Sequence, residues 1–172
     1  AIGANNVASA TYGMATGSTA SDRGLYGMMA RTATSFGVAG DTQKETYVMR
    51  FFGNGTTPGN LTTDGGAIGT TNGPVLVNNS TIGFEGTVVA ALGADWKVWK
   101  VEGGIHRGAN AAATAFGTTG PTVTVLDATA GASTWTLAAL ANTTHGCLQL
   151  QATGPAGFHR WAGHLDCTML QS

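Results

Sequence analysis

Residues 81–106 read TIGFEGTVVAALGADWKVWKVEGGIH, two β-prone runs on either side of Gly93 and Ala94. Valine and aromatic residues recur in both runs, and a short glycine-containing break between such runs is typical of a β-hairpin. In the second run, Trp96 and Trp99 fall on opposite faces because side chains alternate along a strand. A tryptophan on each face predicts a strand that is covered on both sides.

The same pattern of β-prone runs extends through residues 41–172, whose composition differs from that of the first forty residues. Short β-prone runs alternate with turns rich in Gly, Asn, Asp and Pro, and no helical periodicity appears. This pattern predicts an all-β fold, an antiparallel β-sandwich or jelly-roll-like domain over residues 41–172. The expected strands are residues 45–52, 74–77, 81–92, 95–106, 121–126, 134–138, 147–152 and 158–169, with one more short strand inside residues 56–73.

Residues 1–40 read AIGANNVASATYGMATGSTASDRGLYGMMARTATSFGVAG and contain a loose repeat. The segment Tyr12–Ala15 returns as Tyr26–Met29, with a weaker echo at Phe36–Ala39. Glycine and small residues at a regular spacing suit rungs whose backbones approach closely, stacked on neighbouring rungs or chains. A flexible linker is the alternative. The recurring Tyr and Met favour the rungs, because linkers rarely contain aromatic residues.

The composition excludes several classes of protein. The chain has 27 glycines, 10% charged residues and a net charge of −1, with 42% hydrophobic residues, so it is neither disordered nor collagen-like. Eight basic residues face nine acidic ones, which argues against a nucleic-acid partner. No apolar run is long enough to span a bilayer, so we expect no membrane insertion. Scarce charge predicts a surface shared between copies of the chain, although Thr and Asn could also solvate a sheet alone.

Two cysteines lie on the last two expected strands. If those strands form a hairpin about Pro155–Ala156, Cys147 lies near His164 and Cys167 lies near Thr144. The two thiols would then be on adjacent strands without being directly opposite. Two buried free thiols are favoured, while a disulfide across a bulge or a bridge between chains stays open.

The same hairpin would bring His145 near Asp166, with Cys147 and His164 one step along the same face. Cysteine, histidine and aspartate together are plausible metal ligands. However, the sequence contains none of the established zinc-site spacings, and ordinary surface histidines, or histidines at a trimer axis, are the alternative. We therefore expect no metal and no other cofactor.

Four carboxylates could be considered for a glycosidase pair, with tryptophans as a sugar platform. No catalytic motif accompanies them, no phosphate-binding glycine loop is present, and we predict that the chain is not an enzyme. Trp96 and Trp135 are kept as candidates for stacking on a glycan, although tryptophans more often fill a β core. The carboxylates are Glu85, Asp95, Glu102 and Asp127.

The order of short motifs resembles a domain found near the C-termini of tail fibres and tailspikes of tailed bacteriophages and prophages. The resemblance spans residues 23–169, and residues 1–40 are similar to the small-residue repeats of trimeric autotransporter heads and phage fibre shafts. It weakens over Phe158–His164, where the family is more aliphatic. The matching segments are Arg23–Gly27, Ala39–Gln43, Tyr47–Arg50, Leu61–Gly65, Trp99–Gly103, Arg107–Ala112, Val123–Leu126, Asn142–Gly146, Ala152–Gly154 and Arg160–Trp161.

This resemblance implies a homotrimer on the virion, with residues 1–40 as an interwoven shaft and residues 41–172 as the tip. Its partners would be other virion tail proteins and host cell-surface polysaccharide or lipopolysaccharide, and its function would be attachment without catalysis. The alternatives are a decoration or baseplate-associated β protein that binds only other virion proteins, and a polysaccharide-degrading tailspike fragment. The candidate ligand-binding residues are Asn54, Asn60, Asp64, Asn78 and Asn110 in loops, together with Trp96 and Trp135.

Overall fold

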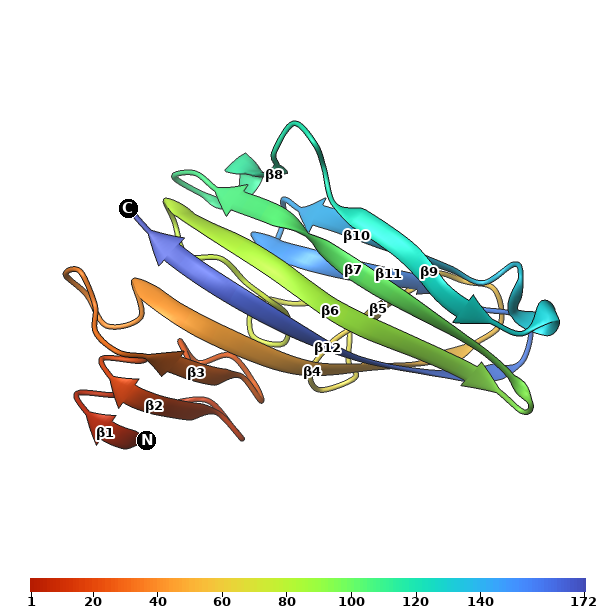
Figure 1. Ribbon diagram of the computed structural model, residues 1–172, viewed down its shortest axis with the longest axis horizontal. Helices are drawn as coiled ribbons and strands as arrows, with labels where there is room; N and C mark the ends of the chain where they lie inside the picture. The colour runs from red at the N-terminus through yellow and green to blue at the C-terminus, as the bar shows by residue number, and fades with distance from the viewer.

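The computed structural model describes residues 1–172 as an all-β chain of two sheets, mostly antiparallel, which confirms the predicted all-β class (Figure 1). The larger sheet has the order β1-β2-β3-β4-β12-β6-β7-β8, with β9 also paired to β7, and the smaller has the order β10-β11-β5. The only helical segments are two single 3₁₀ turns. The strands are β1 Ile2–Ala4, β2 Met14–Ser18, β3 Met29–Thr32, β4 Thr42–Asn54, β5 Gly59–Leu61, β6 Ser80–Leu92, β7 Asp95–Arg107, β8 Thr114–Phe116, β9 Thr122–Ala128, β10 Thr136–Asn142, β11 Cys147–Thr153 and β12 Phe158–Gln171.

Four long strands, β4, β12, β6 and β7, form the body of the larger sheet. The predicted hairpin of residues 81–106 is confirmed: β6 and β7 pair from Leu92 opposite Asp95 to Ser80 opposite Arg107. The turn between them uses Gly93 at a φ of +60°, a conformation that glycine adopts without a steric penalty. These strands alternate buried and exposed side chains along most of their length, so each has one face in the core.

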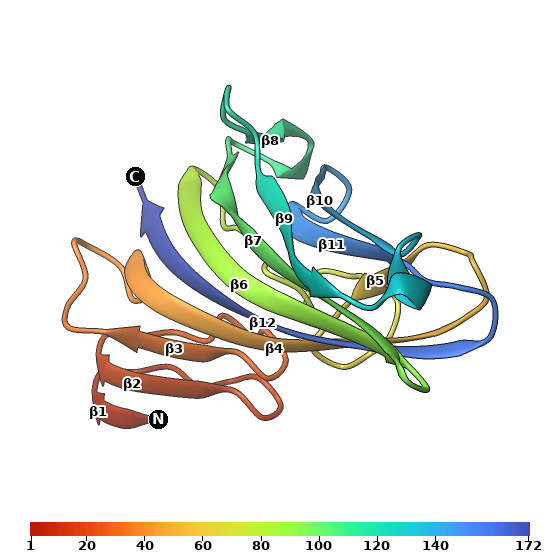
Figure 2. The same cartoon turned by 45° about the vertical axis from the view of Figure 1, so that its right-hand side comes forward.

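The smaller sheet covers one face of the larger sheet, and the core lies between them (Figure 2). Three tryptophans mark its centre: Trp99 stacks on Trp161 with ring centroids 5.0 Å apart, and Trp135 lies 6.4 Å from Trp161. No second layer covers the opposite face of β4, β12 and β6. We call this opposite face of the larger sheet the open face. The expectation that the strand at residues 95–106 is covered on both sides is therefore wrong, because Trp99 is buried while Trp96 is exposed on the open face.

The first three strands are short parallel rungs that continue the larger sheet. β1 pairs with β2 and β2 with β3, and β3 then joins β4 in antiparallel fashion. The backbones approach so closely that a Cβ on Gly3 would lie 1.9 Å from the carbonyl oxygen of Gly17, and one on Gly17 would lie 1.9 Å from that of Thr32. Glycine is thus required here for contact between backbones within one chain.

Substitution of Gly17 by Ala is expected to destabilise the rungs. Gly17 has a φ of +97°, which costs an alanine about 1–2 kcal/mol, and the overlap with Thr32 adds a further cost of about 1–3 kcal/mol. Gly55 provides a matched control, because its φ of +98° is the same and an added Cβ would meet no atom within 4 Å. Urea unfolding should show a larger loss for Gly17→Ala than for Gly55→Ala. Equal losses would mean that the close approach contributes nothing.

A buried carboxylate holds the corner of the first two rungs. Asp22 accepts hydrogen bonds from the backbone N–H groups of Ser9, Ala10 and Gly24, at 3.0, 2.9 and 3.1 Å. Burial acts to raise the pKa of Asp22, but these hydrogen bonds outweigh it and hold the pKa below its usual value of 3.8. Its charged form therefore stabilises the fold.

A second carboxylate closes the loop that leaves the last rung. Asp41 accepts hydrogen bonds from the backbone N–H groups of Val38, Gly37 and Phe36, at 2.9, 2.6 and 3.0 Å. The Val38 N–H makes the largest contribution to lowering the pKa of Asp41 below 3.8. The loop therefore depends on the ionised carboxylate.

Both carboxylates predict an acid-sensitive N-terminal region. Because the folded pKa of each is lowered, their contribution to stability is complete above the usual pKa of 3.8 and is lost as the pH falls through the lower folded values. Backbone NMR spectra should show unchanged rung resonances from pH 7 to 5 and a selective loss at lower pH, roughly between pH 4 and pH 2. The β6–β7 hairpin should persist longer. If the rungs resisted acid as well as this hairpin does, the ionised forms of Asp22 and Asp41 would not be what stabilises them.

The C-terminal strand departs from the predicted hairpin. β12 does not pair with β11; it lies between β4 and β6 and pairs with each of them along nearly its full length. β11 instead pairs with β10 and β5 in the smaller sheet. The physical reason is length, since the 14 residues of β12 match the 13-residue strands β4 and β6, whereas β11 has 7. The segment containing Pro155 carries the chain from one sheet to the other.

The two cysteines are therefore in different sheets. Both are buried free thiols, as the sequence favoured, and the disulfide alternative does not occur within the chain. Burial raises the pKa of Cys147 to about 12, which makes its thiol unreactive at neutral pH. The proposed approach of His145 to Asp166 is wrong, because Asp166 lies opposite Thr46 and Glu85.

One expected strand is reduced to a single bridge. Residues 74–77 make only an isolated pairing, between Val75 and Cys147. The expected strand at residues 134–138 begins two residues later, as β10. The short strand expected within residues 56–73 is confirmed as β5.

Candidate functional site

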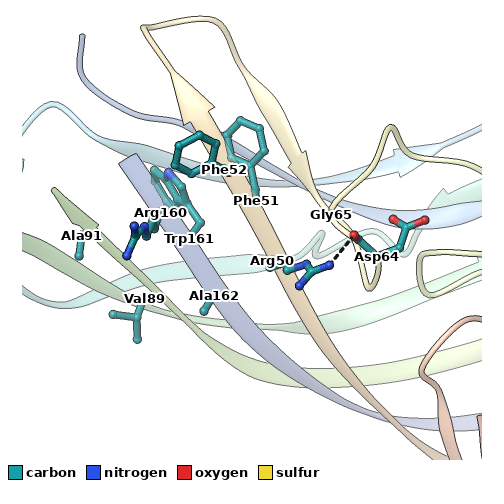
Figure 3. A pocket seen from close by; sticks show the side chains of 10 residues that line it. All are labelled: Arg50, Phe51, Phe52, Asp64, Gly65, Val89, Ala91, Arg160, Trp161 and Ala162. Carbon is teal, nitrogen blue, oxygen red and sulfur yellow. Dashed lines mark hydrogen bonds between the residues drawn. The ribbon is translucent and has the colours of Figure 1, made fainter. Parts of the chain in front are cut away.

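A groove of about 530 Å³ crosses β4, β12 and β6 on the open face (Figure 3). We call it the aromatic–arginine groove. It lies toward the β6–β7 turn, away from the ends of β4 and β12 that adjoin the rungs. The residues that line it are Arg50, Phe51, Phe52, Asp64, Gly65, Val89, Ala91, Arg160, Trp161 and Ala162.

The register of the strands builds this groove from alternating large and small side chains. Phe52, Arg160 and Ala91 are direct neighbours on β4, β12 and β6, and Ala91 faces Trp96 on β7. In the next row Ala162 lies between Arg50 and Val89. The two alanines are shorter than the side chains around them, which leaves a hollow. Strand alternation puts all of these side chains on the same face.

Two phenylalanines form an exposed aromatic wall at one end of the groove, where Phe52 lines the groove and Phe158 lines the adjoining hollow. The rings of Phe52 and Phe158 stack with centroids 5.6 Å apart and an interplanar angle of 14°. They are 59% and 62% exposed, so the stack stands in solvent. Large aromatic rings that are ordered and accessible are suited to contact the apolar face of a ligand.

Arg50 is held in place by the loop that follows β5. Its Nη2 donates to the backbone carbonyl of Asp64 at 2.9 Å, as Figure 3 shows, and its backbone is bonded in both directions to Thr62. The Asp64 carboxylate accepts instead from Thr62, Gly66 and Asn72. Burial acts to raise the pKa of Asp64, but these hydrogen bonds lower it. Asp64 therefore organises the loop and leaves the charge of Arg50 unpaired.

The two groove arginines lack the ion pairs that three other cations of the chain form. Neither Arg50 nor Arg160 has a carboxylate within 4.0 Å, whereas Arg23, Lys44 and Lys100 each form an ion pair. An unpaired guanidinium can donate two parallel hydrogen bonds to a carboxylate or phosphate. The groove thus combines an apolar wall with positive charge.

The structure brings some of the candidate residues to this groove and separates others. Asp64 lines it, Trp96 is in the same row as Phe52 and Arg160, and Asn54 lies opposite Phe158 on β4. Asn60 borders a neighbouring hollow and accepts a hydrogen bond from Gln149.

The remaining candidates lie elsewhere. Asn78 and Asn110 are exposed beyond the ends of β6 and β7 that are farthest from the hairpin turn. Trp135 is only 2% exposed and packs against Trp161, so its expected contact with a glycan is wrong. Its ring is part of the core between the two sheets.

The sequence did not point to Arg50, Phe52, Phe158 or Arg160. All four are on expected strands. They alternate with buried residues, which indicates that each lies on the solvent-exposed face of its strand. The signal that was missing is the pairing of β12 with β4, which brings residues about 108 positions apart into one site.

A second hollow on the open face is acidic. Glu85 lies directly opposite both Glu102 and Asp166, above the small residue Gly83. Glu85 and Glu102 were considered as a glycosidase pair, and they do lie together. However, Glu85 is exposed and Glu102 pairs with Lys100 at 2.6 Å, so nothing buries either group in the way that keeps a catalytic acid protonated. Asp95 and Asp127 lie at other positions on β7 and β9.

This acidic row predicts a stabilising substitution. Like charges directly opposite on adjacent strands repel, and Glu85→Lys would place a cation between two carboxylates. The free energy of unfolding should rise, on the order of 0.5 kcal/mol, as measured by urea unfolding at low salt. Glu85→Gln should give a smaller increase. If both substitutions lowered the free energy of unfolding, repulsion between these carboxylates would not be destabilising the fold.

No group of three or more His, Cys, Asp or Glu side chains is placed to hold a metal ion. None of the helical turns is long and apolar enough to cross a membrane. No protein-family model, curated protein or solved structure matches the chain.

Proposed function

We propose that the chain is the distal part of a homotrimeric tail fibre or tailspike of a tailed bacteriophage, which attaches the virion to host-surface polysaccharide without catalysis. Residues 1–40 form the interwoven shaft, and residues 41–172 form a jelly-roll-like tip. The observation that carries this proposal is a single sheet that runs from the parallel rungs into the long strands and leaves one face uncovered.

Apolar side chains on and beside the rungs favour assembly with further copies. Tyr12 is 79% exposed and packs edge-on against Tyr26, and Met14, Met29 and Val48 are exposed beside it around a shallow hollow. Apolar surface of this extent is typical of a contact between proteins. A closed ring of three copies would bury it and would also explain why the chain needs so few charges.

The place of the aromatic–arginine groove supports attachment. β3 pairs with β4 only around Thr46, whereas the groove lies farther along β4, around Phe52. A trimer held by its rungs would cover the hollow beside Met14 and Val48, which Arg50 also borders, and would leave the Phe52 end of all three grooves accessible. Three weak sites on one particle bind a surface much more tightly than one site does.

Adsorption to cells tests this function. The purified, fluorescently labelled protein should bind a subset of strains in a panel of bacteria, and polysaccharide extracted from a bound strain should compete. No adsorption to any strain, together with binding to phage particles, would instead favour a decoration or baseplate-associated protein. Release of reducing sugar from the polysaccharide would contradict the absence of catalysis.

A further inference from the structure

We propose that the aromatic–arginine groove binds an acidic sugar, with the Phe52–Phe158 stack against a sugar ring. Arg50 and Arg160, whose guanidinium groups point away from each other in Figure 3, offer two separate positions for its carboxylate or phosphate. This inference rests on the proposed function, since it names the ligand class of the same attachment site. The shared chemistry is a pyranose ring that carries one anionic group.

The charges around the groove favour an anion. Arg50 and Arg160 are the two cations of the groove, and neither has a carboxylate within 4.0 Å. The one acidic residue of the groove, Asp64, uses its carboxylate to accept three hydrogen bonds from its own loop. With two arginines and one carboxylate, the groove carries net positive charge on a chain in which only 10% of residues are charged.

Arg50 is also preorganised for this role. Its bond to the Asp64 carbonyl and the contact of its side chain with Gly65 hold the guanidinium beside the hollow (Figure 3). Gly65 has a φ of +79°, and an added Cβ would lie 2.9 Å from Nε of Arg50. A cation that is held before the ligand arrives loses less conformational entropy on binding.

The apolar part of the groove fits a sugar ring. The hollow lies over Ala91 and Ala162, with the phenylalanine stack at its rim. The row from Phe52 to Trp96 crosses four strands, a span of about 14 Å at the usual strand spacing. Trp96 can therefore contact a second sugar ring of the same glycan, and the expected ligand is a short oligosaccharide.

Calorimetric titration of the full chain tests the inference with three defined probes. They are tetragalacturonate, its fully methyl-esterified form, which has the same rings without the charge, and a mannose 6-phosphate oligosaccharide, which carries phosphate in place of carboxylate. Tetragalacturonate or the phosphorylated probe should bind at least about tenfold more tightly than the ester. The stronger of the two identifies the anion that the groove prefers.

Matched variants locate the binding. Arg50→Gln with Arg160→Gln should weaken binding of the acidic probe by about tenfold or more. The control, Lys44→Gln with Lys100→Gln, removes the same charge from the same face, where both lysines are already ion-paired, and should leave binding unchanged. Phe52→Ala should weaken binding of the acidic probe as well.

Three results would overturn the inference: no binding of either anionic probe, equal binding of the acid and the ester, or an equal loss in the control variant. A change in molar mass in Arg50→Gln with Arg160→Gln would also overturn it, because the groove would then be a contact between copies. A failure of the ligand class can be told apart from a failure of the attachment function. A trimer that adsorbs to cells and ignores acidic sugars contradicts only the ligand class, whereas a protein that binds the probes and no cells contradicts the attachment role.

Discussion

Replacement of Arg23 by Met is expected to lower the free energy of unfolding by about 3–5 kcal/mol. Arg23 forms a buried ion pair with Glu45, and its Nη1 donates to the carbonyl of Val75 at 3.0 Å. Glu45 also accepts hydrogen bonds from Tyr47 at 2.6 Å and from Gln43 at 2.9 Å. Removal of the arginine would leave a buried carboxylate without its counter-charge, which is the costly half of such a pair.

The same cluster joins the rungs to β4. Gln43 donates to the carbonyl of Ser21 at 2.9 Å and accepts from its N–H at 3.1 Å, and Arg23 reaches from the rungs to β4. Burial acts to lower the pKa of Arg23, but the neighbouring Glu45 outweighs it and raises the pKa. Loss of the pair should unfold the contact between the rungs and β4 together with the rungs.

Urea unfolding of Arg23→Met against Arg31→Met measures this effect. Arg31 is an exposed arginine on β3, and its substitution should change stability by less than about 0.5 kcal/mol. Should Arg23→Met fail to fold, the double variant Arg23→Met with Glu45→Met remains informative, because it removes both charges and should recover part of the loss. A double variant no more stable than the single one, or equal effects of the two arginine substitutions, would contradict the account.

The second large effect concerns assembly. Met14 and Met29 are directly paired on β2 and β3 and are 44% and 42% exposed in one chain. If copies of the chain meet at this surface, Met14→Asp with Met29→Asp would bury two unpaired carboxylates at every contact, which is prohibitive. The variant should be a folded monomer of 17.3 kDa.

Sedimentation velocity measures this change, with circular dichroism to show that the β structure is retained. Leu126→Asp is the control, since Leu126 is an exposed residue on β9, outside the rungs and β4, and its substitution should leave the assembly intact. A doubly substituted protein with the wild-type mass would show that the rungs do not carry the contact. Loss of mass in the Leu126 variant would place the contact elsewhere.

The local parts of this fold could be predicted from the sequence. The β6–β7 hairpin is two β-prone runs with a two-residue turn, and its pairing partner is the next segment of the chain. The requirement for glycine in the rungs was also readable, because only glycine tolerates the approach seen at Gly3 and Gly17. In both cases the residues that interact are near in sequence.

The long-range pairing could not be predicted, because alternation shows that a strand has two faces without showing its neighbours. β12 alternates equally well as a partner of β11 or as a central strand between β4 and β6. Trp135 failed as a candidate for the same reason, since the pattern around it does not reveal which face the smaller sheet turns to the core. The groove depends on this pairing, which is why the sequence alone could not show that Arg50 and Arg160 line one groove.

The molar mass of the wild-type chain in solution, measured by light scattering, shows whether three copies assemble. Three copies of the 17.3 kDa chain predict about 52 kDa, independent of concentration over a wide range. A mass of 17.3 kDa would contradict the account, because the rungs would then expose Tyr12, Met14 and Met29 to water with no partner to cover them.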